Sequence, residues 1–461
     1  MAVYEAGHIV KICSLAEALP HGHRISAAIL TYDCIMDNAS LKPEQFGVEN
    51  RNIIRAYANT EPEKAESGRD GRYVILELNL ADADAPLMQT VGETGRRVTA
   101  GMDTTPMIWP GSGKGQEAKS AQAGGPDPKS DGQKGAGLSG PANPQKGGPQ
   151  RSRSRVVMSE NRVAVKQLQA LKKADGEEIP AVDEWVASRE GVTQGVEAFQ
   201  VFWHGDIAYN LFIPQKMEAG KTYPLVFFVP DASVKGDDPL IVLTQGNGAM
   251  SFAAPTFQKK HPCFVLAPQI PEHYSARSDQ GVAGMGTMHE KMKEILDEVC
   301  EAFPVDRGRL YNTGQSMGCI LGFGMNICDP DLFAASLLVG GQWGELSTAA
   351  ALKGQKIWML NSDGDARAYP GMNSIAEVLE KEETSVYRFT LNARWPLAGQ
   401  EEACRIAKES GAPVIYGTFT DQSVVPEGVF KSPVSNHMNT WPAAYQLDTV
   451  KEWLFAQRLD Q

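Results

Sequence analysis

The sequence of 461 residues contains no long apolar run: nowhere does it approach the roughly 18 consecutive apolar residues that a membrane-spanning helix needs. Its first residues also lack the basic stretch and apolar core of a secretory signal peptide. We therefore expect no membrane partner and a cytoplasmic location, with secretion only if a signal peptide had preceded this sequence.

An excess of basic charge is missing as well. The chain has 44 Lys and Arg against 56 Asp and Glu, a formal net charge of -12, so as a whole it repels phosphate backbones and nucleic acid is not an expected partner. Cysteines number only 7, and none lie two or three residues apart as zinc ligands do. We interpret them as reduced, mostly core residues and expect neither a metal nor another cofactor.

Large apolar residues almost disappear between residues 110 and 150, where 11 Gly and 6 Pro occur and Leu138 is the one large aliphatic residue. Such a stretch cannot bury enough apolar surface to offset the entropy of ordering it. We predict a disordered insertion at about 110–150 within an N-terminal β domain of residues 1–180. Runs rich in β-branched and aromatic residues on both sides of it, at 24–32, 72–80, 155–158 and 162–168, predict the strands of a small β-sandwich.

From about residue 185 the pattern changes. Short continuous apolar runs such as Leu225 to Val229 and Phe264 to Ala267 are typical of strands buried on both faces, and they alternate with helical stretches. This alternation predicts an α/β domain over residues 185–461, with a mostly parallel sheet flanked by helices. In such sheets ligands bind at the carboxyl ends of the strands.

The segment Gly314-Gln315-Ser316-Met317-Gly318 matches the pattern G-x-S-x-G. It directly follows a predicted strand and opens a predicted helix, the arrangement that exposes a serine oxygen for attack. The alternative is a helix-capping serine between two packing glycines. We favour Ser316 as a nucleophile.

A serine nucleophile needs a base, and in this fold class the histidine follows both the serine and the acid in the chain. Of the eight histidines, only His437 lies beyond Ser316, in a segment that we interpret as a polar loop. The acid should follow a strand between these residues, and Asp363 and Asp365 both follow the predicted strand at 356–361. We prefer Asp365 because it leaves a longer loop for reaching the histidine; either aspartate could instead only shape a turn.

The chain resembles the α/β-hydrolase esterases related to prolyl oligopeptidase that carry an N-terminal immunoglobulin-like domain. The resemblance covers most of the sequence outside the insertion, and it rests on Tyr223 to Phe227, Lys260-His261-Pro262, Phe264 to Gln269, Gly314 to Gly318, Ile357-Trp358 and His437 followed by Trp441. It implies an immunoglobulin-like sandwich before an α/β-hydrolase domain. It also places Asp365 at the position of the family's catalytic acid, with Asn361 and Ser362 replacing a His-Gly pair.

One segment departs from the family. Pro230-Asp231-Ala232-Ser233 stands where the family has His-Gly-x-Gly. Backbone N–H groups stabilise the oxyanion, and we expect those of Ala232 and Met317 to do so, so the lost glycines do not remove the donors. Asp231 would oppose a developing oxyanion if it faced inward, unless it turns toward Lys235 or a backbone amide.

Together these features predict a serine carboxylic-ester hydrolase that acts on a small-molecule ester through an acyl-enzyme. A peptidase of the prolyl-oligopeptidase type and a non-catalytic binding module with a degenerate hydrolase domain are the alternatives, and a homo-oligomer formed through the β domain is left open. Three aromatic residues near the expected cleft, Phe252, Trp343 and Trp441, either line an acyl pocket or simply pack in the core.

Overall fold

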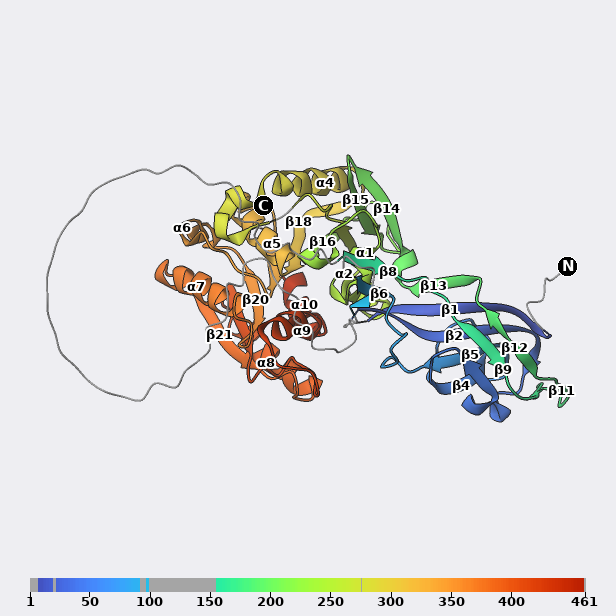
Figure 1. Ribbon diagram of the computed structural model, residues 1–461. Coiled ribbons are helices and arrows are strands. Elements are labelled where there is room, and N and C mark those ends of the chain that lie inside the picture. Colours follow the sequence, from blue (N-terminus) through green and yellow to red (C-terminus); the bar gives the residue numbers. More distant parts are fainter. Residues whose placement is uncertain (1–6, 20–21, 92–96, 99–154, 275, 460–461) are drawn as a thin grey trace, which may run out of the picture.

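A computed structural model describes residues 7–19, 22–91, 97–98, 155–274 and 276–459. The β-rich part of the chain, in blue and green, lies beside an α/β part that runs from green to red (Figure 1). The predicted insertion at 110–150 falls outside the described residues. Among the described helices, none is both long enough and apolar enough to cross a membrane.

The described N-terminal strands form four sheets, of five, three, three and two strands. A five-stranded sheet has the order β13 (Glu190–Gln194), β1 (Ile9–Leu19), β2 (Gly22–Met36), β5 (Gly71–Leu78) and β4 (Ile53–Asn59). A second sheet contains β12 (Val182–Ala187), β9 (Ala164–Gln167) and β3 (Phe46–Val48). The small sheets are β7 (Arg97–Val98), β6 (Met88–Val91) and β8 (Arg155–Met158), and β10 (Leu171–Lys172) with β11 (Glu178–Ile179).

The five-stranded sheet and the sheet of β12, β9 and β3 enclose one apolar core, as a β-sandwich requires. Ile12, Leu30 and Val74 of the first sheet and Phe46 and Val165 of the second belong to one cluster of buried residues. The predicted sandwich is therefore present. The sequence did not predict β1, which lies between β13 and β2 and pairs with both.

His23 lies buried at the start of β2 and supplies a pH-dependent contribution to stability. Its Nε2 is 2.9 Å from Thr193 Oγ1, and Nδ1 is buried without a hydrogen-bond partner. Burial lowers the pKa of His23 from 6.5 to about 4. Because the unfolded chain then binds the proton more readily, this group reduces stability as the pH falls from 6.5 to about 4, by about 3 kcal/mol in all.

We expect His23→Gln to remove this part of the pH dependence. Urea unfolding of both proteins between pH 4 and 8 measures it: the stability of the wild type relative to the variant should fall by about 3 kcal/mol between pH 7 and pH 4. Parallel curves for the two proteins would show that His23 does not titrate in this way.

The C-terminal part is built on a nine-stranded sheet, counted over the described residues. Its last seven strands are parallel to one another, while the hairpin at one edge has two antiparallel strands, of which the inner one also runs antiparallel to the strand beside it. The order is β14 (Phe199–His204), β15 (Ile207–Phe212), β17 (Phe264–Pro268), β16 (Tyr223–Val229), β18 (Val305–Gln315), β19 (Ala335–Val339), β20 (Ile357–Ser362), β22 (Val414–Phe419) and β21 (Val386–Leu391).

Strand β16 explains why the sequence shows continuous apolar runs. Successive side chains of a strand point to opposite faces, and Val226 and Phe228 enter one core cluster while Leu225 and Phe227 enter the other. Helices contribute residues to both clusters. The first is covered by α1 (Ile241–Thr244), α2 (Gly248–Ala253), α3 (Pro255–Lys260), α8 (Leu397–Glu409), α9 (Pro433–Tyr445) and α10 (Asp448–Phe455), and the second by α4 (Met288–Ala302), α5 (Met317–Cys328), α6 (Leu346–Ala349) and α7 (Ala368–Lys381).

Short 3-10 helices occupy several of the connections. They are η1 (Asn38–Ser40), η2 (Pro43–Gln45), η3 (Val196–Ala198), η4 (Ala232–Val234), η5 (Ser278–Met285) and η6 (Ala350–Leu352). The last two helices are separate, since α9 ends at Tyr445 and α10 begins at Asp448.

The junction between the two parts lies just after β13. Val196 and Phe199 are buried in the core of the α/β part, while the preceding strand still pairs with β1. Gly195 has a φ of 87°, a backbone conformation that residues with a Cβ rarely adopt, so a glycine is favoured where the chain crosses. The domain boundary between residues 180 and 185 stays a prediction. The strand β12 lies at this boundary and β13 lies after it, and both pair with strands of the N-terminal part.

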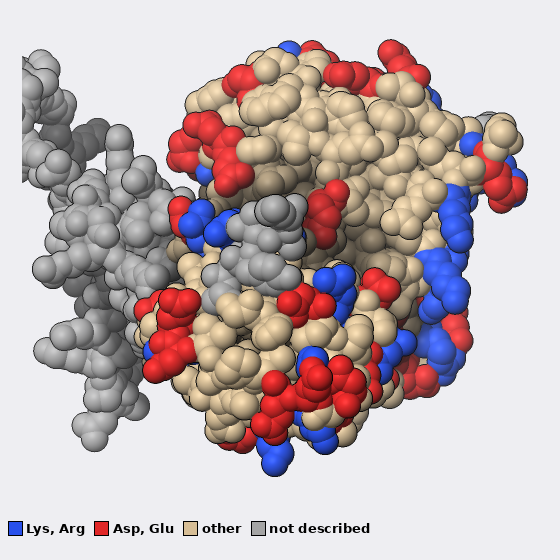
Figure 2. All heavy atoms as spheres, turned by 90° about the vertical axis from the view of Figure 1, so that its right-hand side faces the viewer, with Lys and Arg blue, Asp and Glu red and all other residues tan. Residues whose placement is uncertain are grey.

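Figure 2 shows the molecule from the end that lies to the right in Figure 1. Acidic side chains gather along its lower part, Lys and Arg follow one side, and much of the upper part carries no charge. Acidic and basic side chains therefore lie in different areas of this face, and neither sign of charge covers all of it.

Candidate active site

Ser316 sits at a sharp turn between a strand and a helix. It follows β18 directly, precedes α5, and has a φ of 53° and a ψ of -111°. A non-glycine residue rarely adopts a positive φ, and such strain is typical of functional sites. The amide of Ser316 donates to the carbonyl of Val339 on the neighbouring strand at 3.0 Å, which holds the turn against the sheet.

The two glycines of the motif allow the turn to pack this tightly. A Cβ on Gly314 would lie 2.6 Å from the carbonyl carbon of Gly318, and a Cβ on Gly318 would lie 2.0 Å from the carbonyl oxygen of Val229. Both neighbours are backbone atoms, so neither can move aside like a flexible side chain. The glycines are therefore required by the close approach of α5 to β16.

His437 faces Ser316 from the last part of the chain. Its Nε2 lies 2.8 Å from Ser316 Oγ. The predicted loop is wrong, because His437 lies inside α9, which begins with Ser432 as N-cap, a capping box with Ser435 and Pro433 in the first turn. The helix also presents Trp441, one turn further on, whose ring lies 5.2 Å from the imidazole.

Asp365 lies in the turn between β20 and α7 and contacts the other side of the imidazole. Its Oδ2 is 2.5 Å from His437 Nδ1, and its Oδ1 accepts hydrogen bonds from the amides of Arg367 at 3.0 Å and Ala368 at 2.9 Å. Burial alone would raise the pKa of Asp365, but the hydrogen bond and charge of His437 and the two amides outweigh it and hold the pKa below its usual range.

Asp363, the other candidate acid, does something different. Its carboxylate accepts hydrogen bonds from the amides of Asp421 at 2.8 Å and Gln422 at 3.0 Å, in the turn after β22. It therefore anchors a neighbouring turn. The structure brings Asp365, and not Asp363, to His437.

Asn436 is a buried residue of the site that sequence reasoning missed. It accepts a hydrogen bond from Ser362 Oγ at 2.8 Å and donates to the Ser432 carbonyl at 2.9 Å and to Gln422 Oε1 at 3.2 Å. These contacts tie α9 to the ends of β20 and β22, directly beside His437. The sequence carried one signal, its position next to the only candidate histidine.

The expected oxyanion amides lie at comparable places in the fold. Ala232 is the first residue of η4, and Met317 is the first residue of α5. Amides in the first turn of a helix have no partner within the helix, so both N–H groups remain available to an acceptor as far as the helices are concerned.

The carboxylate of Asp231 turns toward other protein groups. Its Oδ1 accepts a hydrogen bond from the amide of Ser233 at 2.6 Å, and its Oδ2 one from Gln315 Nε2 at 3.4 Å. Of the two arrangements expected from the sequence, the structure has the one with a backbone amide; Lys235 donates instead to the carbonyls of Glu272 and Tyr274. Burial raises the pKa of Asp231, against the opposing effect of its hydrogen bonds and of His437.

The three aromatic residues suggested for an acyl pocket have different environments. Phe252 is fully buried and stacks with Phe455 in the core. Trp343 is also buried, and its Nε1 donates to Thr348 Oγ1 at 2.9 Å. Trp441 alone among the three contacts a member of the Ser–His–Asp group.

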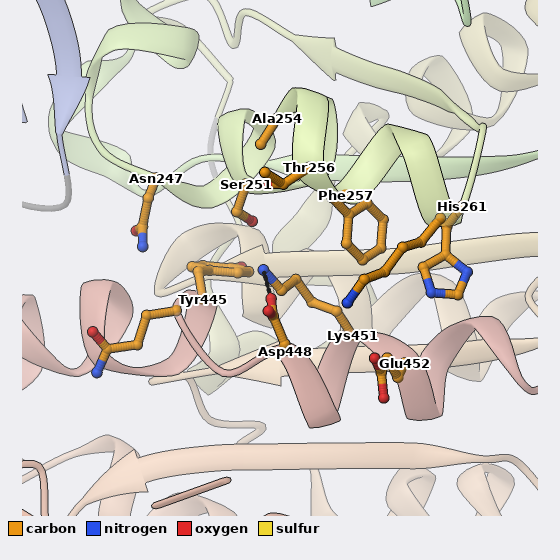
Figure 3. A pocket seen from close by; sticks show the side chains of 12 residues that line it. Asn247, Ser251, Ala254, Thr256, Phe257, His261, Tyr445, Asp448, Lys451 and Glu452 are labelled. Carbon is orange, nitrogen blue, oxygen red and sulfur yellow. Dashed lines mark ion pairs between the residues drawn. The ribbon is translucent and has the colours of Figure 1, made fainter. Parts of the chain in front are cut away.

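A hollow of about 210 Å³ lies away from Ser316, between α3 and α10 (Figure 3). Lys451 and Phe257 project into it, and Lys451 pairs with Asp448 at 2.8 Å, as the dashed line marks. Within the described ranges, one grouping of side chains has ligand atoms close enough to hold a metal ion: His8, Asp33 and Cys34 in the N-terminal part. Neither feature involves Ser316, Asp365 or His437.

The described architecture is an N-terminal immunoglobulin-like β domain followed by an α/β-hydrolase fold. Residues 11–180 match the family model of the esterase Ig-like N-terminal domain. This match and the fold confirm the immunoglobulin-like N-terminal domain and the α/β-hydrolase fold that the sequence predicted.

Several solved structures are similar to this chain. A thermostable esterase shares 20% identity over 97% of this chain and 99% of its own, with a TM-score of 0.71. An acetyl xylan esterase from Aspergillus awamori has 14% identity over 40% of this chain and 80% of its own, with a TM-score of 0.32. A puromycin-hydrolyzing peptidase from Mycobacterium tuberculosis has 12% identity over 63% and 45%, with a TM-score of 0.35. Among curated protein sequences, none matches this chain significantly.

Proposed function

We propose that this protein is a serine carboxylic-ester hydrolase of the carboxylesterase type. The observation that carries the proposal is the continuous hydrogen-bonded series from Ser316 Oγ through His437 to Asp365, with contacts of 2.8 and 2.5 Å, at a strand–turn–helix junction. A nucleophile within hydrogen-bond reach of a base that is itself oriented by a third group is the arrangement that acyl transfer requires.

In the proposed reaction Ser316 Oγ attacks the acyl carbon of the ester while its proton passes to His437 Nε2. The amides of Ala232 and Met317 stabilise the oxyanion of the tetrahedral intermediate. His437 then gives the proton to the departing alkoxide, which leaves as the alcohol. Water, deprotonated by His437, attacks the acyl-enzyme, and Ser316 recovers its proton as the carboxylic acid leaves.

Asp365 orients His437 and stabilises its charged form, which appears in both steps. Its two backbone hydrogen bonds occupy Oδ1 and leave Oδ2 facing the imidazole.

The proposal extends to the organisation of the chain: residues 1–180 would form the non-catalytic β domain, and residues 185–461 the catalytic domain. The substrate of the proposed enzyme would be a small-molecule ester.

A panel of nitrophenyl esters of increasing acyl length, tested beside a panel of peptide amides, decides the reaction class. We expect ester hydrolysis that exceeds amide hydrolysis by at least a factor of about one hundred, because the ester has the better leaving group and the proposed site is built for acyl transfer. Preference for peptides would favour the prolyl-oligopeptidase type of activity. Turnover of neither panel, together with no labelling of Ser316 by a fluorophosphonate, would favour a binding module.

A further inference from the structure

We infer that Asp231 and Gln315 form a positioning pair that sets the spacing between the two oxyanion amides, those of Ala232 and Met317. The inference rests on the proposed function and assigns a role to two residues that the triad does not include. It also explains how an aspartate occupies this segment without facing the oxyanion.

The pair joins the two segments that carry the amides. Asp231 and Gln315 are 2% and 3% exposed, and Gln315 Nε2 donates to Asp231 Oδ2 at 3.4 Å. Gln315 lies two residues before Met317, so a contact to its side chain fixes the loop after β16 relative to the nucleophile turn.

Asp231 fixes its own side of the pair through a second hydrogen bond. The amide of Ser233 donates to Oδ1 at 2.6 Å, which closes a turn around Ala232. Ala232 therefore lies inside a turn that is closed by the hydrogen bond between the Asp231 carboxylate and the Ser233 amide. Because one oxygen faces the loop and the other faces Gln315, the carboxylate transmits the position of one segment to the other.

Backbone packing limits how far the loop can shift without the pair. β16 and β18 are neighbours in register, with Val229 opposite Gly314, and the carbonyl of Val229 lies against Gly318. Pro230 follows with a fixed φ. The loop is thus constrained up to residue 230, and Asp231 is the next point at which it is held.

The pair is also costly to leave incomplete. A carboxylate buried to this degree needs donors, and a buried amide that loses its acceptor costs more than the bond contributed. Replacing the Gln315 donor alone should therefore displace the loop, while exchanging donor and acceptor should restore the contact.

This exchange supplies the test, with the full-length chain and a nitrophenyl ester. Gln315→Glu places two carboxylates together and Gln315→Leu removes the donor, whereas in Asp231→Asn the Gln315 amide can rotate so that its oxygen accepts from the new NH2 group. We expect Gln315→Glu and Gln315→Leu each to lower kcat about 10- to 100-fold with KM within about twofold, because an oxyanion contact acts in the transition state and not in the ground state, and Asp231→Asn to change kcat less than about threefold. In the double variant the new amide donates to the new carboxylate, and kcat should return to within about fivefold of wild type.

Asp237→Asn is the matched control, since it removes an exposed carboxylate from the same loop and should change kcat less than twofold. If Gln315→Glu does not fold, recovery of its thermal midpoint in the double variant reports the same rescue, and Gln315→Leu alone still tests the kcat effect. A kcat in the double variant as low as that of Gln315→Glu would overturn the inference, as would wild-type kcat in Gln315→Leu. These outcomes are separate from failure of the proposed function, which would appear as full activity in Ser316→Ala.

Discussion

Replacing Ser316 by alanine is expected to lower ester turnover by about three or more orders of magnitude while leaving the fold intact. The members of a triad act as a unit, so loss of the nucleophile removes nearly the whole contribution of covalent catalysis. The hydroxyl lies 2.8 Å from His437 Nε2, and its removal leaves the backbone contact of this residue to Val339 unchanged. Steady-state hydrolysis of a nitrophenyl ester measures the loss, and thermal unfolding checks the fold.

A fluorophosphonate probe adds a direct test, because it should label the wild type at Ser316 and fail to label Ser316→Ala. Ser374→Ala provides the matched control: this serine lies on α7, where its hydroxyl donates only to the Pro370 carbonyl. It should keep wild-type activity and labelling. Labelling of Ser316→Ala at the wild-type rate would refute the assignment of the nucleophile.

Asp365→Asn is expected to cost up to about ten-thousandfold in turnover. An asparagine can still accept the amide hydrogens of Arg367 and Ala368 through its oxygen, so the turn should persist. Its NH2 group, however, faces His437 Nδ1 as a donor and favours the wrong tautomer of the imidazole. His437 would then present N–H to Ser316 and could not act as its base.

Asp363→Asn is the control, with an expected loss below about tenfold. The two carboxylates lie on one turn, so a general loss of negative charge would affect both variants alike and cannot imitate the difference. Asp363 holds the amides of Asp421 and Gln422, contacts that an asparagine can partly replace. Turnover of both variants, with thermal midpoints to exclude unfolding, decides the acid: the reverse ranking would assign it to Asp363, and normal activity in both would remove this turn from the triad.

The candidate site was accessible from the sequence where its signals are local. A strand, a sharp turn and a helix surround Ser316 between residues 305 and 328, and a glycine stands two residues away on either side of it. His437 needed no structure either, because it is the only histidine after Ser316. For the acid, the sequence favoured Asp365 over Asp363, but it could not show which of the two contacts His437.

The sequence was less informative about secondary structure near His437. The polar residues around it predicted a loop, but Ser432 and Pro433 begin a helix there, and Asn436 is buried against Ser362. Polarity alone cannot distinguish a solvated loop from a helix whose polar side chains are hydrogen-bonded inside the protein. The same limit applies to the three aromatic residues, of which only Trp441 lies against the imidazole.

The sequence by itself determined the class of fold and singled out Ser316 and His437, because strand and helix periods and the order of residues along the chain can be read without the fold. Only the tertiary structure decided which aspartate meets His437 and where the carboxylate of Asp231 points. Asp365 and His437 are 72 residues apart, and Asp231 and Gln315 are 84 residues apart. Such contacts depend on how β16, β18, β20 and α9 are placed side by side, and that placement results from burying the two faces of the whole sheet, which no single segment encodes.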